Sequence, residues 1–163
     1  MRMQKISNCL WFNNQAEEAA QFYVSVFGGN SKVGTVLHYD EASAEVSGQP
    51  AGSVLTVAFT LHGQDFMALN GGPLFKFTEA ISLVVNCDTQ EEVDHYWNAL
   101  SAVPASEQCG WLKDKFGVSW QIVPTVMEKL LSGDSAKSQR AMKAMLDMKK
   151  LDIAKLQEAY DGK

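Results

Sequence analysis

The sequence has few of the residues that build disulfide, metal or export motifs. Its three cysteines, Cys9, Cys87 and Cys109, are widely spaced, and no C-x-x-C pair occurs. Neither a disulfide framework nor a zinc knuckle is therefore indicated. No apolar run approaches the length that spans a membrane, and the first twelve residues lack the apolar core of a signal peptide. We expect a cytoplasmic protein with reduced thiols and no membrane association.

Runs of basic residues and phosphate-binding loops are also missing. The formal net charge is −5, and no lysine- or arginine-rich segment is present to neutralise phosphates, which argues against a nucleic-acid partner. The glycine pairs at 28–29 and 71–72 do not form a G-x-G-x-x-G between a strand and a helix, so no nucleotide-binding loop is indicated. What is present is a chain of 163 residues, 46% hydrophobic, which is enough for one domain with a core.

Hydrophobic periodicity predicts alternating strands and helices in the first half of the chain. Small and aromatic residues recur every three or four positions from Ala16 to Phe27, and Gly28 follows, as at a helix C-terminus. His62-Gly63 predicts a hairpin turn between the strands expected at 53–61 and 64–70. The expected elements are a strand at 4–12, a helix at 15–27, a strand at 31–40, a polar loop at 40–53 and strands at 53–61 and 64–70.

The same order of elements begins again in the second half. A shift of 75 residues places Ser82 on Ser7, and a shift of 54 places Gln121 on Met67. Identities are few, but both matches fall where the strand-helix-strand order repeats, as an internal duplication would leave them. The shifts differ, so the second copy has a shorter middle, consistent with loss of the loop at 40–53. We predict one α+β domain over 1–163, with module one at about 1–72, module two at about 73–124 and a helical tail at 125–163.

The tail is expected to form helices, with a methionine-rich stripe that packs on a sheet or on a partner subunit. Its ending, KLDIAKLQEAY, and four further segments carry a family resemblance. These segments are LWFNNQAEEAAQFYVSVF, FMALNGGPLFKFTEAISLVV, TQEEVDHYW and CGWLKDKFGVSWQIVP. With them the chain resembles the PhnB-like family, also catalogued as 3-demethylubiquinone-9 3-methyltransferase, of the vicinal oxygen chelate (glyoxalase/bleomycin-resistance) superfamily. The resemblance implies two βαβββ modules whose curled mixed sheet forms a cup, usually completed in a homodimer.

The resemblance also implies where a metal would bind. Active members of the superfamily hold a divalent metal with side chains, typically histidine and glutamate, from the first and last strands of each module. Those positions fall here on Ser7 (or Asn8, one residue along), Met67, Ser82 and Gln121. Neutral side chains of these kinds are poor ligands without charged companions. We therefore expect no tight catalytic metal and no cofactor, and we interpret Gln121 as a hydrogen-bonding residue in a polar cavity.

Other candidates have an ordinary structural interpretation beside the functional one. His38 alternates with Asp40 and is a candidate general base, or a surface histidine at a strand end. Cys109 is a candidate accessible thiol, although no neighbour in the sequence predicts a lowered pKa. The aromatic residues of the expected strands and of the following loop can line a pocket or pack in the core. They are Trp11, Trp111, Trp120, Phe75 and Phe77.

The pocket candidates are Ser7, Trp11, His38, Met67, Ser82, Cys109, Trp111 and Gln121, and the sequence assigns no catalytic residue. Three functions remain open, and whether any reaction is catalysed is undecided. The favoured one is a dimer that binds a small organic molecule in its cup without a metal. The second is a glyoxalase-like lyase or isomerase with a weakly held metal. The third is methylation of a quinone precursor, for which the expected glycine-rich loop and parallel sheet are not indicated.

Overall fold

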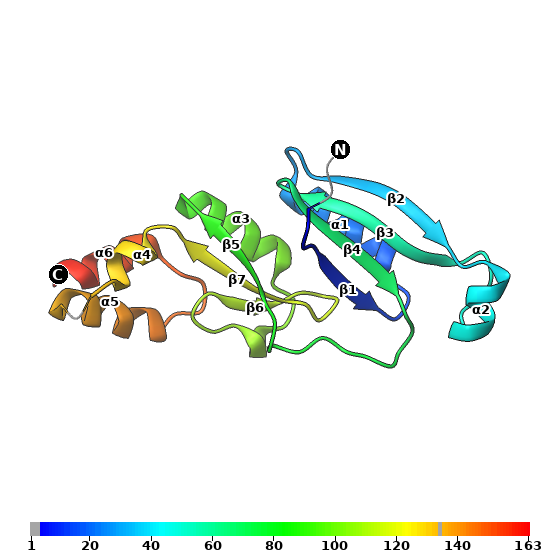
Figure 1. The fold of residues 1–163 in the computed structure, drawn as a ribbon. Coiled ribbons are helices and arrows are strands. Elements are labelled where there is room, and N and C mark those ends of the chain that lie inside the picture. Colours follow the sequence, from blue (N-terminus) through cyan, green and yellow to red (C-terminus); the bar gives the residue numbers. More distant parts are fainter. Residues whose placement is uncertain (1–3, 134) are drawn as a thin grey trace. The chain divides into compact units, whose positions relative to one another are not determined.

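The computed structural model describes residues 4–133 and 135–163 of the chain. The polypeptide forms two compact units, which we call unit one, ending at Phe77, and unit two, beginning at Thr78 (Figure 1). Within the described residues, every helix is too short or too polar to cross a membrane.

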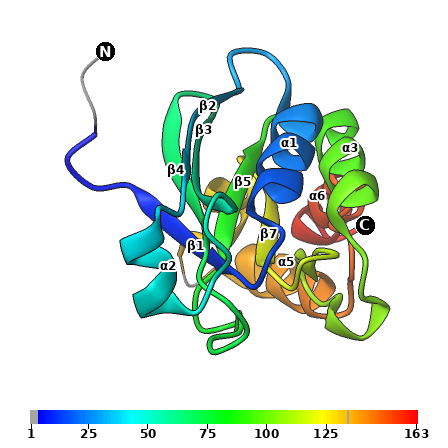
Figure 2. The ribbon, with the colours of Figure 1, turned by 90° about the vertical axis from the view of Figure 1, so that its right-hand side faces the viewer.

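Unit one contains a four-stranded mixed sheet and two helices. Its elements are β1 (Asn8–Phe12), α1 (Ala16–Phe27), β2 (Lys32–His38), α2 (Glu41–Ser47), β3 (Val54–Leu61) and β4 (Gln64–Asn70). The strand order is β1-β4-β3-β2, with β1 parallel to β4 and the other pairs antiparallel. Helix α1 lies along one face of this sheet (Figure 2).

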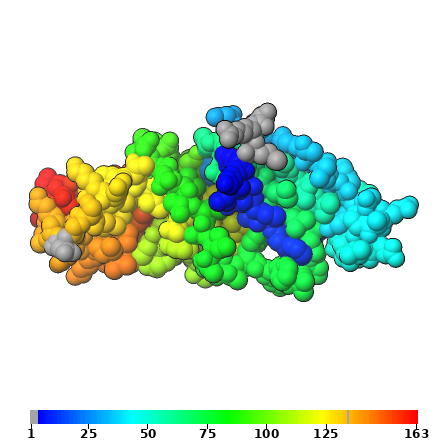
Figure 3. All heavy atoms as spheres, in the orientation of Figure 1, coloured from blue at the N-terminus to red at the C-terminus, as the bar shows by residue number. Residues whose placement is uncertain are grey.

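The core of unit one lies between α1 and the sheet. Strand alternation turns Phe59 and Phe66 toward α1, where the two rings stack with centroids 5.1 Å apart. Tyr23 of α1 stacks on Phe59 at 6.1 Å. The next residues along these strands, including Ala58 and Met67, therefore lie on the opposite face, which we call the outer face of unit one. Figure 3 shows the atoms of β1 at the surface of this unit.

Asn70, at the end of β4, joins three segments of unit one. Its Oδ1 accepts a hydrogen bond from the backbone N–H of Ala16 at 2.9 Å, and its Nδ2 donates to the carbonyl of Val54 at 3.1 Å. The Tyr39 hydroxyl donates to the Asn70 carbonyl at 2.6 Å. Because the first N–H groups of a helix have no partner within it, a side chain from β4 fixes where α1 begins.

Unit two contains a three-stranded mixed sheet, one helix against it, and the helical tail. Its elements are β5 (Leu83–Cys87), α3 (Gln90–Leu100), the short 3₁₀ helix η1 (Pro104–Ser106), β6 (Trp111–Lys113), β7 (Ser119–Pro124), α4 (Met127–Leu131), α5 (Ala136–Leu146) and α6 (Ile153–Asp161). The strand order is β5-β7-β6, with β5 parallel and β6 antiparallel to β7.

The strand registers confirm the predicted repeat. Asn8 pairs with Phe66 in unit one, and Leu83 pairs with Trp120 in unit two. These pairs are related by the two shifts of 75 and 54 that the sequence shows. The segment predicted as a polar loop at 40–53 contains helix α2, so that prediction was partly wrong. Between α3 and β6, the described chain forms η1 and has no counterpart of β2 or α2, so the shorter middle removes a strand and a helix. The predicted α+β class is confirmed, with two open sheets of four and three strands and C-terminal helices.

The core of unit two lies between α3 and its sheet. As the alternation in the sequence predicts, Val118, Trp120 and Ile122 are buried together. The helix contributes Val93 and Trp97 to this core. Trp120 is therefore a core residue, which is one of the two alternatives that the sequence left open.

The tail has an apolar core of its own. It consists of Met127, Leu130, Ala141, Leu151 and Leu156, with Met145 and Met148 partly buried against it. Val123 of β7 packs against the same core, so Met145 and Met148 pack within a tail that also contacts the sheet, whereas Met142 is 40% exposed. The segment between α5 and α6 is joined to the sheet of unit two, because the backbone N–H groups of Cys109 and Gly110 donate to the carbonyls of Met148 and Lys149, each at 2.8 Å.

Candidate functional site

The candidate site is the face of the unit two sheet that points away from α3, which we call the outer face of unit two. Strand alternation places Ser119, Gln121 and Val123 on it, since Trp120 and Ile122 point into the core. In the two ladders, Gln121 lies opposite Val84 of β5 and Trp111 of β6. Gln121 thus occupies the middle of this face.

The structure brings Gln121 and Ser82 together. Both side chains are half-buried, and Gln121 Nε2 donates a hydrogen bond to Ser82 Oγ at 2.9 Å. Strand β5 begins immediately after Ser82, and its parallel pairing with β7 sets this distance. The contact joins the two positions in unit two that the resemblance associates with metal binding. They form a neutral amide–hydroxyl pair.

The donor groups of this pair do not fit the divalent metal of active superfamily members. An amide and a hydroxyl carry no charge, and such metals are held by imidazole and carboxylate groups. Within residues 4–133 and 135–163, no group of three or more His, Cys, Asp or Glu side chains is placed to hold a metal ion.

In unit one, Met67 lies on the outer face, 41% exposed, opposite Cys9 of β1 and Ala58 of β3. Ser7 is exposed just before β1, two residues from Cys9. Desolvation raises the pKa of the Cys9 thiol above its ordinary value, so the thiol stays protonated at neutral pH. His38 is exposed at the end of β2, which β3 separates from β4. The structure therefore places His38 two strands away from Met67.

Trp11 packs against the loop that follows β4. Its indole Nε1 donates to the carbonyl of Gly72 at 2.9 Å, and its ring contacts that of Phe75 edge-on, with centroids 4.9 Å apart. Phe77 packs in the same way on Phe12, at 5.2 Å. The contacts of Trp11 are therefore with this loop, and its polar N–H is already used.

Cys109 belongs to the loop that holds the tail. Its Sγ accepts a hydrogen bond from Gln108 Nε2 at 3.2 Å and lies 3.6 Å from the carbonyl oxygen of Leu146, at the end of α5. The third cysteine, Cys87, is buried, and burial together with the nearby carboxylates raises its pKa to about 11. The Cys87 thiol therefore stays protonated at neutral pH, and the Cys109 sulfur is in contact with Gln108 and with the end of α5.

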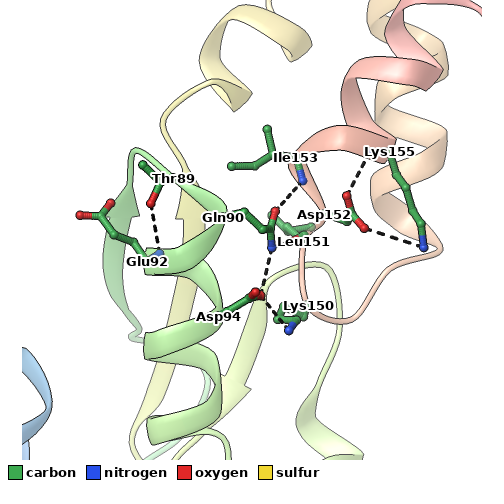
Figure 4. Close-up of polar contacts among 9 residues, drawn as sticks. All are labelled: Thr89, Gln90, Glu92, Asp94, Lys150, Leu151, Asp152, Ile153 and Lys155. Carbon is green, nitrogen blue, oxygen red and sulfur yellow. Dashed lines mark hydrogen bonds and ion pairs between the residues drawn. The ribbon is translucent and has the colours of Figure 1, made fainter.

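A polar cavity of about 510 Å³ lies between α3 and the tail, and the sequence did not predict it. It is lined by Gln90, Asp94, Asp147, Met148, Lys149, Lys150, Asp152 and Lys155. Figure 4 shows the contacts of Gln90, one of these residues: the side-chain Nε2 donates to the carbonyl of Leu151 at 3.1 Å, and Oε1 accepts from the N–H of Ile153 at 2.9 Å. Gln90 therefore attaches the tail to the start of α3.

The charges around this cavity compensate one another. Lys150 Nζ lies 2.8 Å from the carboxylate of Asp94, and this contact, ahead of the hydrogen bond from Gln90, lowers the pKa of Asp94. Lys155 Nζ lies 3.8 Å from the carboxylate of Asp152, which also caps α6. Paired charges and a bridging amide are typical of an attachment between segments. We therefore base the functional proposal on the outer face of unit two.

Comparisons with known proteins agree with this fold. The family model described as 3-demethylubiquinone-9 3-methyltransferase matches residues 4–123. A PhnB protein from Bacillus cereus that carries the same methyltransferase name is 38% identical, and the match covers 75% of this chain and 100% of that one, with a TM-score of 0.61. No curated protein matches the chain significantly. The family match ends before α4, so the helical tail lies outside it.

Two more distant structures share the fold alone. A Pseudomonas aeruginosa protein is 22% identical over 75% of this chain and 98% of its own, with a TM-score of 0.55. The fosfomycin resistance protein FosX from Listeria monocytogenes, in its complex with Mn(II) and sulfate, is 14% identical over 80% of this chain and 97% of its own, with a TM-score of 0.50.

Proposed function

The chain belongs to the 3-demethylubiquinone-9 3-methyltransferase (PhnB-like) family of the vicinal oxygen chelate superfamily, and on this basis we propose that it binds a small organic molecule without a catalytic metal. The binding surface is the outer face of unit two. The observation that carries the proposal is the hydrogen bond between Gln121 and Ser82, the two positions in unit two that the family resemblance associates with metal binding.

The chemistry of this face suits recognition by hydrogen bonds and ring contacts. After Gln121 donates to Ser82, its Oε1 is an acceptor, and the Ser82 hydroxyl keeps a proton to donate. Trp111 adds a half-buried aromatic ring opposite Gln121. A few oriented polar groups beside an aromatic surface are typical of small-molecule sites.

Methyl transfer, which the family name suggests, has less support in this chain. A Rossmann-type enzyme that uses S-adenosylmethionine needs a parallel sheet with a glycine-rich first loop. Both sheets here mix parallel and antiparallel strands, and the sequence contains no G-x-G-x-x-G. Fold alone does not decide chemistry, so the proposal depends on the site.

Metal content tests the proposal directly. After incubation with Ni²⁺, Zn²⁺, Mn²⁺ or Fe²⁺ and desalting, we expect elemental mass spectrometry of the untagged protein to find far less than one metal per chain, because the donors are uncharged. A Ser82→His/Gln121→Glu variant supplies an imidazole and a carboxylate at the same two positions, and we expect it to retain more metal than the unaltered protein, which shows that the assay reports on these positions. About one metal per chain in the unaltered protein would contradict a metal-free site and favour a metal-assisted enzyme.

We also propose that the protein is a homodimer. The outer face of unit one carries exposed apolar side chains, among them Leu37, 53% exposed, and Met67, 41% exposed. Apolar surface of this kind is typical of interaction sites. Light scattering is expected to give twice the chain mass of 17.9 kDa, and a Leu37→Glu/Met67→Lys variant is expected to shift the protein toward one chain mass. A single-chain mass for the unaltered protein at micromolar concentration would refute the dimer.

A further inference from the structure

We propose that Ser119 is a third ligand-binding group on the outer face of unit two, and that the ligand is an uncharged aromatic compound with a hydrogen-bonding group such as an amide or a carbonyl. This inference rests on the proposed function, because it concerns the same face. It adds one residue to the site and gives the chemical class of the ligand.

Ser119 is a buried hydroxyl that lacks a partner. The residue is 2% exposed, and its Oγ makes no hydrogen bond within the described part of the chain. It lies on β7 two residues before Gln121, so alternation places both side chains on the outer face. A buried polar group without a partner lowers stability, and alanine at this position would avoid that cost. A hydroxyl that supplies a hydrogen bond to a ligand accounts for its presence here.

The charges on this face point to an uncharged ligand. Of the described strand residues that the register places on it, Lys113 alone is charged. Its ammonium group is bound to the carboxylate of Glu79, and this contact lowers the pKa of Glu79, which therefore stays ionised. An anionic ligand would have to compete with Glu79 for Lys113, and a cationic ligand with Lys113 for Glu79. A charged ligand would lose hydration without gaining an unpaired counter-charge.

The remaining neighbours point to a flat ring. Trp111 and Val84 lie on either side of Gln121 in the sheet, from β6 and β5, and Val84 is 52% exposed. An indole ring and a branched aliphatic side chain offer apolar surface to an aromatic compound. The hydrogen-bonding groups of Ser82, Ser119 and Gln121 provide both donors and acceptors, which match an amide or a carbonyl.

Three compounds of nearly equal shape separate the alternatives: benzamide is uncharged, benzoate is an anion and benzamidine is a cation. In ¹H–¹⁵N NMR titrations of the intact protein, we expect benzamide to shift the signals of Ser82, Trp111, Ser119 and Gln121. Benzoate and benzamidine are expected to bind at least about tenfold more weakly, because their charge is not compensated. Equal or tighter binding of either ion at these residues would overturn the ligand class and leave the proposed site intact. Absence of shifts at these residues with all three compounds would overturn both proposals.

Ser119→Ala tests the residue itself. The variant is expected to bind benzamide about tenfold more weakly, through loss of one hydrogen bond, while its Tm is unchanged or higher. Thr60 is the matched control, because its Oγ1 is the other buried side-chain polar atom without a partner among the described residues, and it belongs to unit one. Thr60→Val should leave benzamide binding unchanged. Unchanged binding in Ser119→Ala, or a lowered Tm with normal binding, would overturn the role given to Ser119.

Discussion

Asp114→Ala is expected to lower the free energy of unfolding of unit two by about 3–5 kcal/mol, because it removes the acceptor of three hydrogen bonds, and each donor left unsatisfied costs about 1–3 kcal/mol. Asp114 is 1% exposed and lies directly after β6, at the start of the turn that connects β6 to β7. Its Oδ1 accepts from the backbone N–H groups of Phe116 at 2.9 Å and Val118 at 3.0 Å. Its Oδ2 accepts from the indole Nε1 of Trp120 at 2.8 Å. Alanine would leave these donors without their acceptor and a space beside the core.

Asp114→Asn separates charge from shape. The amide oxygen can still accept two hydrogen bonds, but its NH₂ group would face the indole N–H of Trp120, so we expect a smaller loss, about 1–3 kcal/mol. Asp147→Ala is the matched control at an exposed aspartate and should change stability by less than about 0.5 kcal/mol. Chemical denaturation followed by tryptophan fluorescence, with hydrogen exchange resolved by unit, measures all three. A loss in Asp114→Ala no larger than that of the control would refute the role of the network.

The fold was largely predictable because its main signals are periodic. Alternation at Val118, Trp120 and Ile122 identified the buried face of β7, and the two shifts reproduced the strand registers of both sheets. The missing counterpart of β2 could not be predicted, because a shortened segment does not show which element it has lost. The structure of the intervening residues resolves this as η1.

The candidate site was predictable only where it follows from strand register. The shifts placed Ser82 at the position of Ser7 and Gln121 at the position of Met67. The parallel pairing of β5 and β7 then brings Ser82 and Gln121 into contact. Asp114 was missed because KDKFG has the composition of an exposed turn, and its burial depends on the Trp120 indole. The missing partner of Ser119 and the contacts of Gln90 with the tail depend on side-chain geometry, which periodicity does not encode.

A second large effect is expected at Gly71, where backbone and ring are in close contact. A Cβ atom at this position would lie 2.2 Å from Cζ2 of Trp11, and two further ring atoms would lie at 2.4 Å. The φ angle of Gly71 is outside the left-handed region, so alanine is compatible with the backbone and the conflict is with the ring alone. Gly71→Ala should therefore displace Trp11 and break its 2.9 Å hydrogen bond to the carbonyl of Gly72. We expect the free energy of unfolding of unit one to fall by about 3 kcal/mol.

A double-mutant cycle separates this cause from a general effect of glycine replacement. In a Trp11→Leu background, the obstructing ring atoms are absent, so adding Gly71→Ala should cost less than about 1 kcal/mol. It can even stabilise unit one slightly, because alanine restricts the unfolded chain more than glycine does. The difference between the two backgrounds is the energy of the ring–backbone contact. Equal losses in both would mean that the backbone at Gly71, and not the packing of Trp11, determines the effect.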